Sequence, residues 1–291
     1  MKRSIGEKSF DAFNVVLMLL IIIITVYPIL YVVFASFSSP ALFVRNTSAV
    51  LWRPLGFSLA SYKAVFSNIN IWNGYRNTIF VVVVGVALNI VMTVMAGYVL
   101  SRPNLMLRRF LNLFCMFTMY FSGGVVPTYL IVKGYGLQDS RLALILPVAI
   151  NTYNMIIMRS ACENVPESLI EAARVDGASH LRILIKVMVP VLSPTIAVLV
   201  LYYGVKHWNA WFDALIYMRT RSKYPLQLFL REMIIENTAA STARSASDDE
   251  SLTEQTIKYA TIIVATVPIL MLYPFLQRFF VKGIMVGAVK G

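Results

Sequence analysis

The sequence has 291 residues, of which 58% are apolar and only 14% are charged. An average soluble protein has about 25% charged residues, so this composition excludes an ordinary soluble enzyme and indicates a protein solvated by lipid. Lys and Arg exceed Asp and Glu by 26 to 14, and in a membrane protein this excess reflects cytoplasmic loops rather than nucleic-acid binding. The two cysteines, Cys115 and Cys162, are too few for a disulfide framework and are expected to be free thiols.

Six apolar segments of the sequence are long enough to cross a membrane. None of them contains Asp, Glu, Lys, Arg or His, and an apolar helix of about 20 residues spans a bilayer. The first segment is too long for a cleaved signal peptide and no A-x-A site follows it, so we expect it to remain as an anchor. The sequence therefore predicts an all-α polytopic membrane protein with six transmembrane helices, at residues 13–35, 77–100, 110–132, 142–158, 187–205 and 259–277.

The distribution of Lys and Arg predicts the orientation of these spans. Both residues are denser in the two terminal segments and in the loops 101–109 and 159–186 than in the other connections, and cytoplasmic loops collect basic residues. Both termini are therefore expected on the cytoplasmic side of a bacterial plasma membrane. The chain then divides into a cytoplasmic tail at 1–12, a first span at 13–35, an extracytoplasmic loop at 36–76, a core at 77–277 that includes a cytoplasmic loop at 160–190 and an extracytoplasmic loop at 206–258, and a cytoplasmic tail at 278–291.

The predicted spans lack the groups that a self-driven transporter needs. A carrier driven by protons or sodium usually holds an ionisable residue at bilayer depth, and no predicted span has one. A pump that hydrolyses ATP itself would need a phosphate-binding string such as G-x-x-x-x-G-K-[ST], which the sequence does not contain. We therefore expect no catalytic residue, no metal site and no cofactor on this chain, and any ATP and Mg²⁺ would be bound by partner subunits.

The cytoplasmic loop contains a short predicted helix. Asn164 and Pro166 mark its start, because proline is tolerated in the first helical turn, and Asp176-Gly177 marks its end. Ser179 can cap a second helix that runs into the fifth span. From these residues alone, a helix resting on the membrane surface and a helix that docks on a partner both remain open.

The sequence of this loop resembles the EAA signature of ABC importer permeases, E-A-A-x3-G-x9-I-x-L-P. Glu171-Ala172-Ala173 is followed by Gly177 and then by Val187-x-Val189-Pro190, with valine in place of Ile and Leu. The similarity covers most of the chain and points to the carbohydrate-uptake branch, to the second permease of complex-oligosaccharide importers and more distantly to the smaller permease of the maltose importer. The strings that carry it lie at 121–129, 156–159, 176–178, 207–212, 224–227 and 281–291.

This resemblance implies the type I ABC importer permease fold and a set of partners. These partners are a second permease that completes the channel, two ATPase subunits, an extracytoplasmic solute-binding protein and an oligosaccharide substrate, in a setting of membrane lipid and without nucleic acid. The residues that the resemblance assigns to ATPase coupling are Glu171, Ala172, Ala173, Asp176 and Gly177. By similarity to the maltose importer, the C-terminal tail is expected to contact the ATPase pair through Gly287, Ala288, Val289, Lys290 and Gly291.

The same resemblance implies a solute path between the two permeases. Gly123-Gly124 and Pro127 are expected to break the third span and expose backbone carbonyls to that path, and a kink filled by Ser122 and Thr128 is an equal alternative. The uncharged polar residues of the spans suit a hydroxylated solute or hold helices together, and the outer aromatic residues suit sugar stacking or a membrane-interface belt. The candidate path residues are Ser122, Gly123, Gly124, Pro127, Asn151, Tyr153, Asn154, Tyr202, Tyr203, Trp208 and Trp211.

A basic cluster, Arg219, Arg221 and Lys223, marks the later extracytoplasmic loop. It would attract sugars that carry uronates, dock an acidic lobe of a binding protein, or rest on anionic lipid headgroups, and all three interpretations remain open. The expected function is that of a permease subunit of an ATP-driven ABC importer for an oligosaccharide. The alternatives are a passive channel, which has no use for a docking loop, and a sensor or assembly subunit that does not transport.

Overall fold

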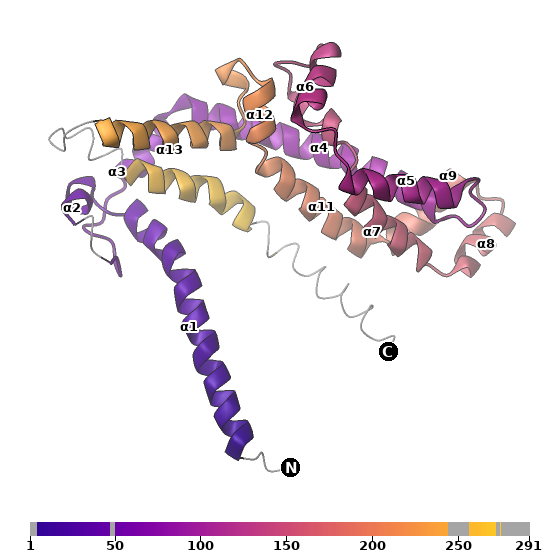
Figure 1. The fold of residues 1–291 in the computed structure, drawn as a ribbon, viewed down its shortest axis with the longest axis horizontal. Helices are drawn as coiled ribbons and strands as arrows, with labels where there is room; N and C mark the ends of the chain where they lie inside the picture. Colours follow the sequence, from indigo (N-terminus) through magenta and orange to yellow (C-terminus); the bar gives the residue numbers. More distant parts are fainter. Residues whose placement is uncertain (1–4, 47–49, 244–255, 272–273, 275–291) are drawn as a thin grey trace. The chain divides into compact units, whose positions relative to one another are not determined.

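The computed structural model describes residues 5–46, 50–243, 256–271 and 274, and the regular structure in this part of the chain is helical (Figure 1). The prediction of an all-α fold is therefore confirmed. The chain divides into two compact units, one within residues 1–69 and 230–267 and the other within 70–229 and 268–291.

The first unit contains the long N-terminal helix α1 (Ile5–Ser36) and the short helices α2 (Pro40–Arg45) and α3 (Ala60–Ser67). Its small core buries Ala35, Phe43 and Leu51. Within Ser9–Ser36 the most apolar 18-residue window has 0% of its residues buried. Since an apolar helix is solvated by lipid without any protein partner, α1 has the properties of the predicted membrane anchor.

The second unit is built around α4 (Ile69–Ser101), and its helices follow one another with short connections. They are α5 (Arg108–Tyr120), α6 (Val125–Gly134), α7 (Thr152–Glu163), α8 (Glu167–Val175), α9 (His180–Ile183), α10 (Val189–Val191), α11 (Ser193–Trp208), α12 (Phe212–Tyr217) and the start of α13 (Leu226–Ala243), with 3-10 turns at Arg141–Leu144, Leu146–Val148 and Arg221–Lys223 and a π turn at Leu184–Met188.

Two glycines let α4 pack closely against its neighbours. A Cβ atom added to Gly97 would lie 2.6 Å from Cγ of Met158 on α7, and one added to Gly85 would lie 2.6 Å from Nε2 of His207 on α11. Real Cβ atoms do not approach so closely, so both positions require glycine for this packing. The helix α4 is therefore the support against which α7 and α11 are fixed.

Each predicted apolar segment contains a helix in the described part of the chain. Ser9–Ser36 and Ile69–Ser101 are each long and apolar enough to cross a membrane, and the count rises to five if each of three bent helix pairs forms one span. The sixth predicted segment, 259–277, begins in a shorter apolar helix over Thr256–Met271. Its remaining residues, apart from 274, lie outside the described residues.

Three of the predicted spans are bent helix pairs. The third bends by 109° between Tyr120 and Val125, where Gly124 has a φ of 86° that glycine adopts readily. The fourth begins with 3-10 turns and bends by 49°. The fifth bends by 83° near Pro190 and Pro194, each of which lacks an N–H for the helix ladder. The second helix, which Ser179 caps, runs into the start of this span before the bend.

Candidate functional site

The predicted loop helix is present as α8. Pro166, Asp176 and Gly177 lie at its ends as predicted, whereas Asn164 follows the end of α7 and does not mark the start of α8. Pro166 is the residue before its first turn, and Asp176 is the residue after its last. Gly177 follows with a φ of 73°, and its N–H bonds the carbonyl of Arg174 while the N–H of Ala178 bonds that of Ala173. These two bonds form a Schellman motif, which ends the helix and satisfies its last carbonyls.

One face of α8 is fixed to the body of the unit. Ile170 has 0% exposure and belongs to the main apolar core, together with Val165 before the helix and Ile183 on α9. Ala173, which lies nearly one turn after Ile170, is half-buried against the same core. Burial of an isoleucine side chain stabilises a fold by about 2 kcal/mol, so this contact contributes to holding the helix in place.

The other face of α8 is bare. Glu171, Ala172, Asp176 and Gly177 are exposed, so four of the five predicted coupling residues lie at the surface and Ala173 lies at its edge. Two apolar side chains accompany them, because Leu169 is 46% exposed and Val175 is 88% exposed. The face therefore combines small, apolar and acidic groups on a helix whose opposite side is anchored.

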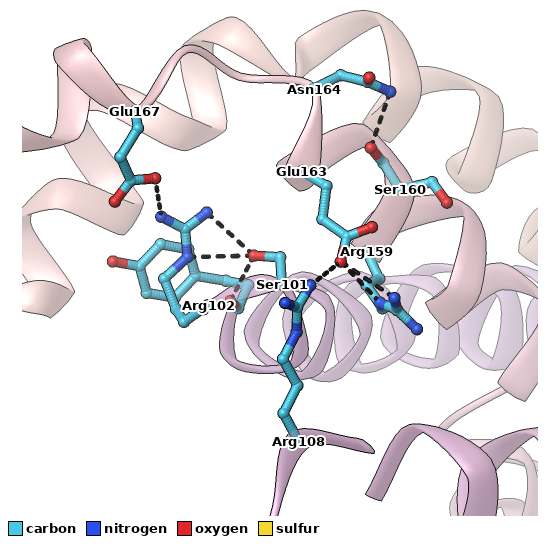
Figure 2. Close-up of polar contacts among 9 residues, drawn as sticks. Ser101, Arg102, Arg108, Arg159, Ser160, Glu163, Asn164 and Glu167 are labelled. Carbon is cyan, nitrogen blue, oxygen red and sulfur yellow. Dashed lines mark hydrogen bonds and ion pairs between the residues drawn. The ribbon is translucent and has the colours of Figure 1, made fainter. Parts of the chain in front are cut away.

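An ion pair from the preceding loop anchors the start of α8 (Figure 2). An N–H of Arg102 donates to Oε2 of Glu167 across 3.3 Å, and two further N–H groups of this guanidinium donate to the hydroxyl of Ser101 at 3.0 and 3.2 Å. The guanidinium also lies 4.9 Å from the ring centroid of Tyr98. The sequence marks Arg102 only as a topological signal. Its pairing with Glu167 joins two loops and could not be found from either loop alone.

A second carboxylate ties the start of α5 to the end of α7 (Figure 2). Oε1 of Glu163 accepts two hydrogen bonds at 3.1 Å from Arg159, one turn earlier on α7, and one from Arg108 at the start of α5. The residue after α7, Asn164, donates its side-chain N–H to the carbonyl of Ser160. Glu163 and Asn164, which lead from α7 into α8, are therefore both fixed by side-chain hydrogen bonds.

The break predicted in the third span is confirmed, and its polar groups are partly satisfied. Phe121–Gly124 separate α5 from α6. The hydroxyl of Ser122 accepts from the N–H of Gly124 at 3.2 Å, and the hydroxyl of Thr128 donates to the carbonyl of Gly124 at 2.8 Å. This arrangement is the alternative in which Ser122 and Thr128 fill the kink. Ser122, Gly123, Gly124 and Pro127 are nevertheless all exposed.

Several candidate path residues form a buried polar network instead of facing a cavity. The hydroxyl of Tyr203, which is 1% exposed, pairs with that of Thr93 at 2.7 Å and accepts from the N–H of Asn151 at 3.2 Å. The side chain of Asn151 caps α7 by accepting from the N–H of Asn154, which is itself buried. These groups hold α4, α7 and α11 together.

The network continues through a residue that lay just past the predicted fifth span. His207 is buried on α11, and its Nε2 lies 2.7 Å from Oδ1 of Asn89 on α4. The amide nitrogen of Asn89 donates to the carbonyls of Val148 and Ala149. The end of α11 at Trp208 extends beyond the predicted boundary at 205, which is why His207 was not expected inside a helix core.

The remaining candidate path residues differ in access. Tyr153 and Tyr202 are exposed, Trp211 is half-buried and Trp208 is buried, with its ring centroid 6.4 Å from that of Tyr75. The predicted tail contacts Gly287 to Gly291 lie outside the described residues.

The basic cluster of Arg219, Arg221 and Lys223 has a counterion within the chain that the sequence did not reveal. Asp139, between α6 and the first 3-10 turn, accepts from Nζ of Lys223 at 2.7 Å and from the hydroxyl and N–H of Thr220 at 2.7 and 2.9 Å. It also accepts from the N–H of Arg219 at 3.0 Å. The bond from Lys223, followed by those from Thr220, holds the pKa of the Asp139 carboxyl well below its usual range.

No family model matches the chain. Two curated relatives match nearly all of it. It is 39% identical to the polygalacturonan/rhamnogalacturonan transport system permease protein YtcP of Bacillus subtilis (strain 168) over 286 residues, which cover 98% of this chain and 99% of the relative. It is 38% identical to protein LplC of the same organism, with 100% and 98% of the two chains covered.

A solved structure matches equally broadly. A chain in the crystal structure of a bacterial ABC transporter involved in the import of the acidic polysaccharide alginate superimposes with a TM-score of 0.86. The sequence identity is 32%, and the match covers 96% of this chain and 99% of the other.

Proposed function

The chain belongs to the family of permease subunits of ABC sugar importers, and we propose that it forms one half of the translocation path for an acidic oligosaccharide. A second permease forms the other half, and an extracytoplasmic binding protein delivers the sugar. The family assignment makes the protein a transporter subunit of the bacterial inner membrane. The second permease, the binding protein and the acidic substrate are parts of our proposal.

The coupling role is supported by the difference between the two faces of α8, one of which is fixed to the permease while the other is exposed. Ile170 and the Arg102–Glu167 pair fix one side to the permease, while Glu171, Ala172 and Asp176 face outward. A helix fixed in this way moves with the body of the unit. When a pair of separate ATPase subunits binds ATP and closes, α8 passes that motion to the spans as a shift between two states.

This role sets the orientation of the protein. ATPase subunits work in the cytoplasm, so α8 and both termini face inward. The tail residues Gly287 to Gly291 then reach the ATPase pair. ATP and Mg²⁺ are bound by those subunits, because the sequence lacks a phosphate-binding string.

The acidic substrate is supported by the relatives and by the outer surface. The names of the two matches refer to polygalacturonan or rhamnogalacturonan in one case and to alginate in the other. On this chain Arg219 and Arg221 are exposed in the extracytoplasmic loop beside Lys223, and positive charge there raises the encounter rate with polyanionic sugars. Asp139 offsets part of this charge through its ion pair with Lys223.

The proposal is tested with the importer reconstituted in vesicles together with its partner subunits and binding protein. Gly177→Asp places a negative charge beside Asp176 on the docking face, and aspartate tolerates the left-handed backbone better than most residues. We expect normal amounts of the variant in the membrane, ATP hydrolysis without sugar uptake, and wild-type behaviour for Lys63→Asp outside the second unit. Normal uptake by Gly177→Asp would contradict the coupling role. Deletion of Gly287 to Gly291 should likewise lower coupled ATPase activity.

The passive-channel and sensor alternatives give different results in the same vesicles. An importer concentrates an oligogalacturonide inside only when ATP is supplied, a channel equilibrates it without ATP, and a sensor moves none. Replacement of Arg219 and Arg221 by Ser should lower uptake of the acidic sugar more than uptake of a neutral one. Equal losses would indicate docking of the binding protein instead.

A further inference from the structure

An open cavity of about 560 Å³ lies between the first half of α5 and the end of α7. Three of the side chains around it are basic: Arg108 and Arg109 from the first turn of α5, and Arg159 from α7. Asn112, Leu113 and Met116 of α5 complete its wall. The cavity is therefore strongly basic at one end and apolar along its side.

The positive charge in this cavity is only partly neutralised. Glu163 accepts hydrogen bonds from both Arg108 and Arg159 (Figure 2), and the cavity wall carries a third guanidinium group, that of the exposed Arg109. The Nε atom of Arg108 is buried and has no hydrogen-bond partner among the described residues. This atom is closed off from the cavity, so the group available to an anion there is the exposed guanidinium of Arg109.

The start of α5 adds to this preference for an anion. Leu107 precedes the helix with a φ of 57°, and its side chain has no group that can cap the first N–H groups. These N–H groups give the helix start a partial positive charge, which favours a negative ligand near Arg108 and Arg109.

The cavity lies on the same pair of helices as several candidate path residues. Thr118 on α5 and Thr152 on α7 pair through their hydroxyls at 3.3 Å, about 15 Å along α5 from Arg108. Ser122 to Gly124 and Asn151 to Asn154 lie at that far end. Polar groups are therefore present at both ends of the contact between α5 and α7.

We propose that this arginine cavity is an inner subsite for the carboxylates of an acidic oligosaccharide. Arg109 contacts a uronate carboxylate, and Leu113 and Met116 pack against the apolar face of the sugar ring. The inference rests on the proposed function, because it assumes that the substrate is acidic. The subsite receives the sugar at the cytoplasmic end of the path and favours its forward movement by charge.

The test loads the vesicles described above with a galacturonide oligosaccharide on the cytoplasmic side and measures how strongly it inhibits uptake. A fully methyl-esterified oligosaccharide of the same length is the neutral control. In the wild type the acid should inhibit at lower concentration than the ester. Arg109→Gln should raise the half-inhibitory concentration of the acid about three- to tenfold and leave that of the ester unchanged.

Two variants control for folding and for general charge. Arg109→Lys keeps the charge and should retain most of the inhibition by the acid. Arg182→Gln removes an exposed basic residue of α9 outside the cavity and should behave as wild type. Equal inhibition by acid and ester, or an unchanged value in Arg109→Gln, would overturn the subsite.

Vesicles prepared with and without anionic phospholipid distinguish a sugar carboxylate from a lipid headgroup as the occupant of the cavity. If Arg109→Gln affects both sugars equally, and only when anionic lipid is present, the cavity binds lipid and the proposal is wrong. If the wild type takes up no acidic oligosaccharide at all, both the proposed substrate and the subsite are wrong. If it takes up the acidic oligosaccharide but is not inhibited by it from the cytoplasmic side, only the subsite is wrong.

Discussion

Charged contacts stabilise both ends of the second unit, but they leave an exposed helix face at one end and fix a loop at the other. At the α8 end, Arg102 and Ile170 fix one face of a helix and leave the other face bare. At the Asp139 end, one carboxylate accepts four hydrogen bonds, so few of its lone pairs remain for a partner. The first end is therefore suited to transmit force to a partner, and the second is suited to fix the shape of its own loop.

The largest expected effect separates the two faces of α8. Ile170→Ala should lower the free energy of unfolding by about 3 kcal/mol, because it leaves a cavity in the main core. Leu169→Ala, on the partly exposed side, should cost less than about 1 kcal/mol. Thermal unfolding of the purified protein in detergent checks both values. Equal losses would show that α8 is not anchored through one face.

The next effect is expected at the Asp139 end. Asp139→Ala removes the acceptor for the N–H groups of Arg219 and Thr220 and for Lys223, and should destabilise this loop locally by about 2 kcal/mol. Asp139→Asn keeps an acceptor oxygen for the two amides and should cost less. Hydrogen exchange of the Arg219 and Thr220 amides measures the local opening. Unchanged exchange in Asp139→Ala would contradict the role of the carboxylate.

The lowered pKa of Asp139 gives this contact a defined pH dependence. A carboxyl whose pKa is depressed in the folded state contributes its full stability above its unfolded pKa of about 4, and loses it as the pH falls toward the folded value. The difference in loop stability between the wild type and Asp139→Asn should thus stay constant from pH 8 to pH 5 and shrink below about pH 4. A change between pH 7 and pH 5 would indicate another titrating group.

A smaller effect is expected at the end of α8. Gly177 has a positive φ, and an added Cβ would meet no atom within 4 Å, so Gly177→Ala should cost about 1 kcal/mol from backbone strain alone. Gly177→Asn should cost less, since asparagine adopts this conformation more readily. Chemical denaturation of the three proteins checks the order, and a larger cost for Asn would point to a steric cause.

The smallest expected effect concerns the anchor at the start of α8. Glu167→Gln removes a partly exposed ion pair with Arg102, and such pairs contribute less than about 1 kcal/mol and weaken in salt. The difference from the wild type should vanish at about 1 M salt. A cost that persists at high salt would show that the contact acts through packing.

The sequence predicted the elements that depend on local signals. Pro166, Asp176 and Gly177 define the ends of α8 through backbone preferences of their own, and Gly123-Gly124 broke the third span as expected. The fifth span bends by 83° between His180–Val191 and Ser193–Trp208, and a hydropathy pattern does not report such a bend.

The contacts that the sequence could not predict join residues far apart in the chain. Asp139 meets Lys223 and Asn89 meets His207 only because the helices between them pack in one particular way. Tyr203 was a candidate for the path, and only its partners Thr93 and Asn151 show that it holds helices together. Side-chain type alone does not distinguish a polar group that faces a solute from one that satisfies a neighbour.

The central claim is that the bare face of α8 transmits the motion of separate ATPase subunits, and site-directed photo-crosslinking tests it most directly. A photoreactive residue is placed at Ala172 on this face and, as a control, at Lys63 in α3. In the assembled, transport-competent importer, we predict an ATPase adduct from position 172, changed in yield by ATP, and none from position 63. A transporting complex in which position 172 reacts only with lipid or with the second permease would contradict the account.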